Sequence, residues 1–282
     1  KTVEEIMRNS DLALYRAKDE GGGEHCQYEP TLHAHAEERR KLEFSLRRAL
    51  ERDEFELHYQ PVVDANEETV VSFEALIRWN SEEHGFVRPD KFIALAEDTR
   101  LIVPIGAWVL ETACLEAVNW PTHVRIAVNV SPIQFQKSNF VSSVLNSIAA
   151  SGIEPEQLEL EITESVFLEG GSGNVEIFNS LKRVGVRLAL DDFGTGYSAL
   201  GYLQKAPFDK IKIDQSFVKG AAEVGSVNAA IVASIVSLAE TLGMDTTAEG
   251  AETMKELELV RDLGCSHVQG YVYGKPMNVE SA

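Results

Sequence analysis

Cysteine is scarce in this sequence, which argues against a disulfide-stabilised protein and against a cysteine-based zinc site. The chain has 282 residues and three cysteines, Cys26, Cys114 and Cys265. An odd number at scattered positions fits neither a disulfide framework nor the ligand spacing of a zinc site. We therefore expect a protein of a reducing compartment, the cytoplasm.

Long apolar runs are also lacking. The longest, AAIVASIVSLA at residues 229–239, is far shorter than the ~18 residues of a membrane-spanning helix. Its serines and spacing suit a buried helix, so we expect no membrane contact in this fragment. We also expect no signal peptide in this segment. The sequence begins at Lys1 within a helical pattern, which predicts a piece of a longer protein whose upstream part could carry a membrane anchor.

Basic residues are outnumbered by acidic ones. The sequence has 26 lysines and arginines against 45 aspartates and glutamates, a formal net charge of -19. This balance argues against nonspecific binding to a nucleic acid polymer or an anionic membrane, because both need basic patches. A solvated acidic surface explains most of the charge. A cluster of carboxylates that awaits cations adds to it.

Strands and helices are predicted to alternate after Asp53. An amphipathic helix is expected over residues 1 to about 20, ending at Gly21–Gly23, and a strongly charged helix over residues 30–53. Strands are then expected at 55–63, 70–79, 124–131, 157–164, 186–192, 209–214, 244–249 and 267–273. Helices are expected at 89–97, 104–119, 137–150, 173–184, 227–242 and 253–263.

This order predicts the fold class. Glycines at 152, 185, 243 and 264 follow expected helices, as in the αβ turns of a parallel sheet. Eight strands with helices over ~230 residues predict a modified (β/α)8 TIM-type barrel with a helical extension at the N-terminus. The first two strands are too close in sequence for a crossover helix, so the first should be antiparallel. Residues 169–173, EGGSG, are expected to be flexible.

The expected strands have one apolar face and one face that carries chemistry. Ile211 and Ile213 alternate with Lys212, and Leu160 and Ile162 alternate with Glu161. A carboxylate within such a run costs several kcal/mol unless something compensates it. In a closed parallel barrel the apolar faces meet the outer helices and the other faces meet inside.

Oxygen-bearing side chains at the ends of four strands predict a metal site. Mg2+ and Mn2+ prefer such ligands, and two ions ~3.5–4 Å apart form a clamp for displacement at phosphorus. A lone pair of aspartates would more often cap a loop, but three other strand ends supply further candidates. The predicted ligands of the two ions are Glu74, Asn129, Glu161, Asp191 and Asp192.

Lys212 is the predicted cation among these acids. A buried lysine needs carboxylates or an anion beside it. One interpretation is a structural salt bridge inside the barrel, to Asp214 or Glu161. The other is that Lys212 holds and polarises the attacking water or a phosphate oxygen.

Further polar residues follow the later strands. Glu249 points inward and is a candidate base or water ligand, whereas Glu252 could instead be a first-turn acid favoured by a helix dipole. Gln269 can hydrogen-bond a water or a metal-bound group. Gln60 could read a base edge, and Arg78 could fork onto a phosphate.

A glycine-rich segment, DDFGTGYSAL at residues 191–200, follows the aspartate pair. After a catalytic strand it suits a mobile loop that closes over a substrate or orders the second metal. Glu164, at the rim of the neighbouring strand, is the predicted anchor of this loop.

These segments together resemble the EAL-domain family of cyclic di-GMP phosphodiesterases. The resemblance runs from Glu38 to Met277 and includes YQPVV, EALIRW, NVSPIQF, ELEITES, DDFGTGYSAL, KIDQSF, AEGAET and QGYVYGKPM, in that order. It implies hydrolysis of cyclic di-GMP to linear pGpG with two Mg2+ or Mn2+ ions, in a domain over residues 31–282 that forms a homodimer. It also implies the metal ligands above, the catalytic residues Lys212, Glu249, Glu164, Glu252 and Gln269, and the substrate contacts Gln60, Leu76, Arg78 and Asp214.

The segment SDLALYRAKDEGGG resembles the last helix of a GGDEF diguanylate cyclase domain. It implies that residues 1–30 are the C-terminal fragment of such a domain and a linker, without the signature needed for cyclase activity. Three alternatives to the phosphodiesterase stay open from the sequence: a cyclic di-GMP receptor without turnover, an interaction scaffold, and a barrel hydrolase of another phosphoester.

Overall fold

The computed structural model describes residues 31–194, 200–203, 206–223 and 225–282, with scattered positions before residue 31. The helix expected over residues 1–20, its glycines and the middle of the DDFGTGYSAL segment fall largely outside the described residues. The chain divides into two compact units. The smaller unit comprises residues 1–55 and 79–99, and the larger comprises residues 56–78 and 100–282.

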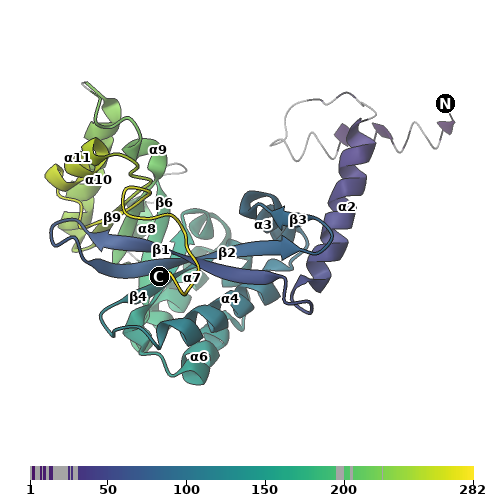
Figure 1. The fold of residues 1–282 in the computed structure, drawn as a ribbon, viewed down its shortest axis with the longest axis horizontal. Coiled ribbons are helices and arrows are strands. Elements are labelled where there is room, and N and C mark those ends of the chain that lie inside the picture. The colour runs from purple at the N-terminus through teal and green to yellow at the C-terminus, as the bar shows by residue number, and fades with distance from the viewer. Residues whose placement is uncertain are drawn as a thin grey trace. The chain divides into compact units, whose positions relative to one another are not determined.

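The larger unit contains the expected barrel (Figure 1). Its strands are β1 (Phe55–Asp64), β2 (Val70–Ser81), β4 (Arg125–Val130), β5 (Leu158–Thr163), β6 (Arg187–Phe193), β7 (Lys210–Ile213), β8 (Asp245–Glu249) and β9 (His267–Gln269). From β2 through β4 to β9 each strand pairs in parallel with the next. β1 pairs antiparallel with β9 and also pairs with β2, which closes the ring. The predicted barrel with an antiparallel first strand is confirmed.

Helices cover the outside of the ring. The long ones are α4 (Ile102–Ala117), α6 (Phe140–Ser151), α7 (Ser165–Val184), α10 (Val227–Leu242) and α11 (Met254–Asp262). α4 packs on β4, α7 on β6, and α10 on β7 and β8. Short helices α5 (Pro132–Phe135), α8 (Leu200–Leu203) and α9 (Gln215–Val218) and the 3-10 turn η1 (Pro155–Gln157) lie between them. α7 and α10 end at Gly185 and Gly243, both with the left-handed backbone expected for such caps.

The glycine-rich segment 169–173, which was expected to be flexible, has a helical backbone. It lies within α7, which begins at Ser165, well before the predicted start. The helix is held on both sides of the glycines: the Asn174 side-chain amide donates to the Val166 carbonyl at 2.7 Å, and Phe178 is fully buried. Tertiary packing therefore outweighs the low helix propensity of glycine.

The last strand is shorter than predicted. β9 ends at Gln269, and the chain turns with a hydrogen bond from the Tyr273 amide to the Gly270 carbonyl. A Cβ atom at Gly270 would lie 2.1 Å from the Ala251 carbonyl oxygen. The two backbones therefore touch here, and only glycine fits.

The barrel interior is filled by charged side chains at two levels. Leu160, Ile162 and their apolar neighbours face the helices and are fully buried. On the opposite face of β5, Glu159 pairs with Lys210 on β7 at 2.6 Å, and both side chains are at most 2% exposed. One level further toward the strand ends, Glu161 pairs with Lys212 in the same way, at 2.8 Å. The alternation predicted from the sequence is therefore confirmed.

The smaller unit has its own core. It consists of α2 (Thr31–Ala49), β3 (Gly85–Val87), α3 (Pro89–Asp98) and the adjoining ends of β1 and β2. Trp79 is fully buried against Phe92, and its indole N–H donates to Glu54 at 2.8 Å. β3, which the sequence analysis did not predict, pairs antiparallel with the end of β2. Among the described residues, no helix combines the length and hydropathy needed to cross a bilayer.

Candidate active site

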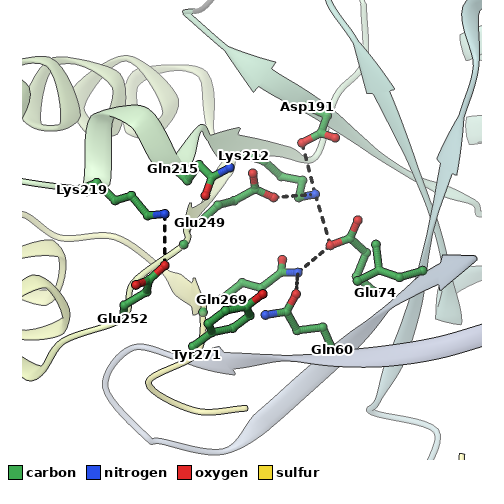
Figure 2. Close-up of a pocket in the computed structure, with 13 residues that line it drawn as sticks. Gln60, Glu74, Asp191, Lys212, Gln215, Lys219, Glu249, Glu252, Gln269 and Tyr271 are labelled. Atoms are coloured by element: carbon green, nitrogen blue, oxygen red, sulfur yellow. Dashed lines mark hydrogen bonds and ion pairs between the residues drawn. The ribbon is translucent and has the colours of Figure 1, made fainter. Parts of the chain in front are cut away.

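The polar faces of the barrel strands meet at a cavity of about 310 Å³ within the larger unit. β7, β8 and β9 run parallel, so their carboxyl ends come together at one mouth, where catalytic residues of such barrels lie. Figure 2 shows the residues that line this cavity. They are Gln60, Glu74, Leu76, Asp191, Lys212, Gln215, Lys219, Glu249, Gly250, Glu252, Gln269, Gly270 and Tyr271.

Lys212 lies at the centre of the charges. Its ammonium nitrogen lies 2.7 Å from Glu249 Oε1, 2.8 Å from Glu161 Oε2 and 3.1 Å from Asp191 Oδ1. Glu74 Oε2 is 3.9 Å away. The Lys212 side chain is 2% exposed. When all four carboxyls are ionised, their charge exceeds that of the one buried cation, and a further cation would neutralise the surplus.

Glu74 is fixed by two amides. Asn129 Nδ2 donates to Glu74 Oε1 at 2.6 Å, and Gln269 Nε2 donates to Glu74 Oε2 at 2.5 Å. Gln269 Nε2 also lies 3.3 Å from Gln60 Oε1, and Gln60 Nε2 donates to the Gly274 carbonyl. These hydrogen bonds join β1, β2, β4 and β9 across the barrel, so Glu74 is held in one orientation.

The pKa values of the acids diverge according to their partners. Burial works against ionisation of Glu74, but Lys212 and the two amides hold its pKa below the usual value. For Glu161 the balance is reversed, because burial and the charges of Glu74 and Asp191 outweigh Lys212 and raise its pKa well above the usual value. Burial, with the charges of Asp191 and Glu74, raises the pKa of Glu249 to about 8. Burial alone would lower the pKa of Lys212, but the surrounding carboxylates raise it well above its usual value. Neighbouring carboxyls thus differ in proton affinity, as in sites of acid–base chemistry.

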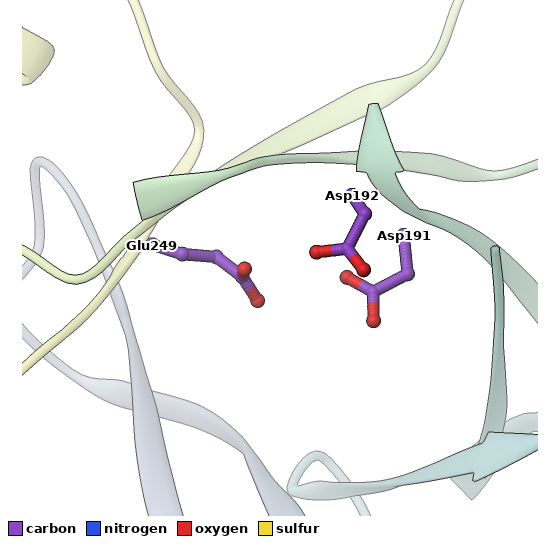
Figure 3. Close-up of side chains that lie close together, drawn as sticks. All are labelled: Asp191, Asp192 and Glu249. Atoms are coloured by element: carbon purple, nitrogen blue, oxygen red, sulfur yellow. The ribbon is translucent and has the colours of Figure 1, made fainter. Parts of the chain in front are cut away.

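The aspartate pair lies on a bulge of β6. Leu190 pairs with Ile211 and Phe193 with Ile213, so β6 has one residue more than β7 over this stretch. Asp192 lies in this bulge and has a left-handed backbone, with φ 55°. As a result, oxygens of Asp191, Asp192 and Glu249 all lie within 4.8 Å of one another (Figure 3).

This cluster has the donor set of a divalent metal site. Its atoms are carboxylate oxygens, the ligands that Mg2+ and Mn2+ prefer. Asp191 Oδ1 is buried and accepts no hydrogen bond, although the Lys212 ammonium is near. Burial and the charge of Asp191 raise the pKa of Asp192. Asp191, Asp192 and Glu249 can therefore hold a metal ion that would relieve their repulsion.

Other predicted residues take different places around the cavity. Gln60 and Leu76 line it, and Glu164 accepts a hydrogen bond from the Gly194 amide at 3.4 Å, next to the loop that it was predicted to anchor. Arg78 is half-buried and donates to the Ile77 carbonyl. Asp214 accepts from the Ser216 amide at 2.9 Å and so caps α9. Neither Arg78 nor Asp214 is among the lining side chains.

Five of the lining residues were not predicted from the sequence: the glycines Gly250 and Gly270, and three residues with functional side chains. Gln215 and Lys219 belong to the short helix α9 and the residue that follows it, directly after β7. Tyr271 follows β9 and is 54% exposed. Only their position in the sequence could have indicated them, because each comes shortly after a strand end that carries a predicted catalytic residue.

The match to a known family fits this geometry. The sequence matches the EAL domain over residues 44–276. The chain belongs to the EAL domain family. A solved structure described as "PaMucR Phosphodiesterase, c-di-GMP complex" is 42% identical and superposes with a TM-score of 0.81, covering 86% of this chain and 99% of that one.

Two curated relatives match this chain over part of a longer sequence. The bifunctional diguanylate cyclase/cyclic di-GMP phosphodiesterase MucR of Pseudomonas aeruginosa is 42% identical over 99% of this chain and 41% of its own length. The cyclic di-GMP phosphodiesterase PdeR of Escherichia coli is 35% identical over 96% of this chain and 41% of its own length. The chain thus spans about two fifths of the length of these relatives.

Proposed function

We propose that this EAL domain is a metal-dependent phosphodiesterase that hydrolyses cyclic di-GMP to linear pGpG. The observation that carries the proposal is the cluster of four carboxylates around Lys212 at the mouth of the barrel. The EAL-family relative MucR and the related PaMucR complex, both named for cyclic di-GMP, supply the substrate. Hydrolysis of this messenger would lower its level in bacterial signalling.

Two Mg2+ or Mn2+ ions are the proposed cofactors. Asp191, Asp192 and Glu249 offer a close group of oxygens. Glu74 and Glu161 lie beside Lys212, and Asn129 contacts Glu74, so these three can supply further ligands. When bound, such ions lower the pKa of a water and neutralise charge on the phosphate. Glu74 is already oriented by its two amides, so little rearrangement is needed before it can act as a ligand.

The protein's own groups position the nucleophile and move its proton. Lys212 orients the attacking water through its ammonium group, which three carboxylates hold within 3.1 Å. Glu249 lies 2.7 Å from Lys212 and its raised pKa suits a group that takes up the water's proton. The water oxygen then forms a bond to phosphorus, the bond to the 3′ oxygen breaks, and the leaving oxygen receives a proton. Gln269 and Glu252 lie on the cavity wall beside this reaction.

The cavity wall also suits a nucleotide. Tyr271 is more than half exposed at the mouth and offers a flat face on which a base can stack. Burial lowers the pKa of Arg78, and the charge of nearby Glu74 offsets part of this effect. Its guanidinium could fork onto a phosphate.

We also propose that residues 1–30 are the end of a GGDEF domain, that residues 31–282 are the phosphodiesterase domain, and that this domain forms a homodimer. The match to the bifunctional MucR extends over 99% of the chain, beyond residues 44–276. This extension supports the first assignment. Sedimentation of the purified chain over a range of concentrations tests the last.

Product analysis tests the function. The chain is incubated with cyclic di-GMP at varied Mg2+ and Mn2+, and the products are separated by chromatography. We expect linear pGpG to appear only when metal is present. Binding of cyclic di-GMP without turnover would make the domain a receptor instead. Turnover of other cyclic dinucleotides or of nitrophenyl phosphodiesters in preference would indicate a hydrolase of another phosphoester.

A further inference from the structure

Lys219 forms an ion pair across the rim of the cavity. Its ammonium nitrogen lies 3.0 Å from Glu252 Oε1, and both side chains are 48% exposed. Figure 2 shows this pair on the opposite side of the cavity from Glu74 and Asp191. The pair joins the end of α9 to the loop between β8 and α11.

The ion pair between Lys219 and Glu252 contributes little to the stability of the fold. An exposed ion pair contributes at most ~1 kcal/mol. The backbones on both sides are fixed by other bonds: Asn228 Nδ2 donates to the Lys219 carbonyl at 3.1 Å, and the Glu252 amide donates to Glu256 Oε2 at 3.0 Å. The Lys219 side chain can therefore exchange its partner while its main chain stays in place.

Lys219 differs from the other lysine of the cavity in its exposure and in the number of its carboxylate partners. Among the described residues that line the cavity, the cationic side chains are Lys212 and Lys219. Lys212 is 2% exposed and surrounded by four carboxylates. It therefore cannot also bind an anion at the other side of the cavity. Lys219 has one carboxylate partner in the structure and is open to solvent.

The proposed substrate, on whose assignment this inference rests, has two phosphodiester groups on opposite sides of its ring. While one is hydrolysed beside Lys212, the other is an anion at the far side of a cavity with four carboxylates in its wall. An uncompensated phosphate there would be repelled. A lysine is suited to this position, because it binds phosphate as a point charge without demanding one geometry.

We propose that Lys219 binds the phosphate that is not hydrolysed, exchanging Glu252 for the substrate. Lys219 is then a substrate-binding residue that distinguishes cyclic dinucleotides from esters with a single phosphate. Because it contacts a group that does not change during the reaction, it stabilises the bound substrate and the transition state equally. Its loss should raise KM and leave kcat unchanged.

The test compares the wild type with Lys219→Gln on two substrates in Mg2+, cyclic di-GMP and bis(p-nitrophenyl) phosphate. For cyclic di-GMP we expect KM to rise about tenfold, the usual effect of losing one charged hydrogen bond, with kcat within about twofold. For bis(p-nitrophenyl) phosphate, which has one phosphate, we expect no change in either constant. Lys219→Arg should restore most of the affinity.

Two further measurements separate this role from a general effect of charge. Lys255→Gln removes a charge from an exposed lysine of α11 that does not line the cavity, and it should leave KM unchanged. Raising the NaCl concentration should increase the KM of the wild type for cyclic di-GMP more steeply than that of Lys219→Gln, because salt screens the contact that the variant lacks. Thermal unfolding of each variant checks that the fold is intact.

The outcomes are distinct. An increase in KM confined to the cyclic dinucleotide and reversed by arginine supports the inference. An unchanged KM, an equal loss on both substrates, or a loss confined to kcat overturns it, since Lys219 would then act on the fold or through Glu252. Absence of turnover of cyclic di-GMP by the wild type overturns the proposed function itself, and the inference with it.

Discussion

The carboxylates of Asp191 and Asp192 reach the same point of the cavity although the two residues are adjacent on one strand. Side chains of neighbouring strand residues normally point to opposite faces. Here the bulge in β6 and the left-handed backbone of Asp192, φ 55°, bring oxygens of both within 4.8 Å of each other and of Glu249. Bringing these acids together costs backbone strain at Asp192 and repulsion between the carboxylates. Such unfavourable arrangements are typical of functional sites.

Replacing Asp192 with glycine should therefore stabilise the metal-free domain and impair it as an enzyme. Glycine adopts a positive φ without strain, and the raised pKa of Asp192 shows that its negative charge is unfavourable in the folded protein. We expect the free energy of unfolding in urea, measured in a chelator at neutral pH, to rise by about 1 kcal/mol. Turnover should fall at least tenfold.

Asp192→Asn is the matched control, because asparagine also tolerates a left-handed backbone but lacks the charge. It should lose turnover with a smaller gain in stability than the glycine variant. A glycine variant that is less stable than the wild type would show that the conformation of Asp192 is not strained.

The buried pair of Glu159 and Lys210 should be required for stability as a pair. Burial opposes ionisation of Glu159, yet Lys210 and Arg187 hold its pKa below the usual value, so it is charged in the folded protein at neutral pH. Lys210→Met removes the direct partner of that charge and leaves Arg187 Nε 3.5 Å away, so it should lower the free energy of unfolding by about 3 kcal/mol. Stability contributed by a lowered pKa is present above the usual pKa and is lost as pH falls through the folded value.

The double variant Glu159→Leu with Lys210→Met tests the cause. Because the buried carboxylate that lost its lysine is also removed, the double variant should be more stable than Lys210→Met alone in urea denaturation at neutral pH. A double variant that is less stable than the single variant would mean that packing, not the buried carboxylate, explains the loss.

Strand parity made the barrel and most of its inner residues predictable. Lys212 between two isoleucines and Glu161 between Leu160 and Ile162 could be assigned to the inner face, because alternation is a local property of the sequence. The bulge at Asp192 was not predictable, since DDF reads as an ordinary strand end and the shift arises from pairing with β7. Lys219 was missed for a related reason: it reaches the cavity only because α9 is one short turn.

Glu164 should control how the loop after β6 is ordered. It accepts a hydrogen bond from the Gly194 amide, and burial raises its pKa. Glu164→Ala removes the acceptor, so we expect turnover to fall about tenfold and the Mg2+ concentration for half-maximal rate to rise. Initial rates over a Mg2+ series measure both. An unchanged Mg2+ requirement would mean that this glutamate does not help to order the metal site.

Metal affinity should increase with pH. The raised pKa values of Glu249, about 8, and of Glu161 mean that metal binding must displace protons at neutral pH. Below about pH 8, we expect the affinity for Mn2+, measured by electron paramagnetic resonance, to rise up to about tenfold per pH unit for each proton released. Glu249→Gln should flatten this dependence. An affinity that is independent of pH from 6 to 8 would contradict the protonation of these groups.

The central claim is that the acids gathered around Lys212 hold the metal that hydrolyses cyclic di-GMP, and turnover by Glu74→Ala in Mg2+ tests it most directly. Glu74 joins Asn129, Gln269 and Lys212 in one network, so its loss should remove a ligand and the order around it. We expect the rate of pGpG formation to fall more than about 100-fold, with thermal unfolding close to that of the wild type. A variant that retains near-normal turnover would contradict the account.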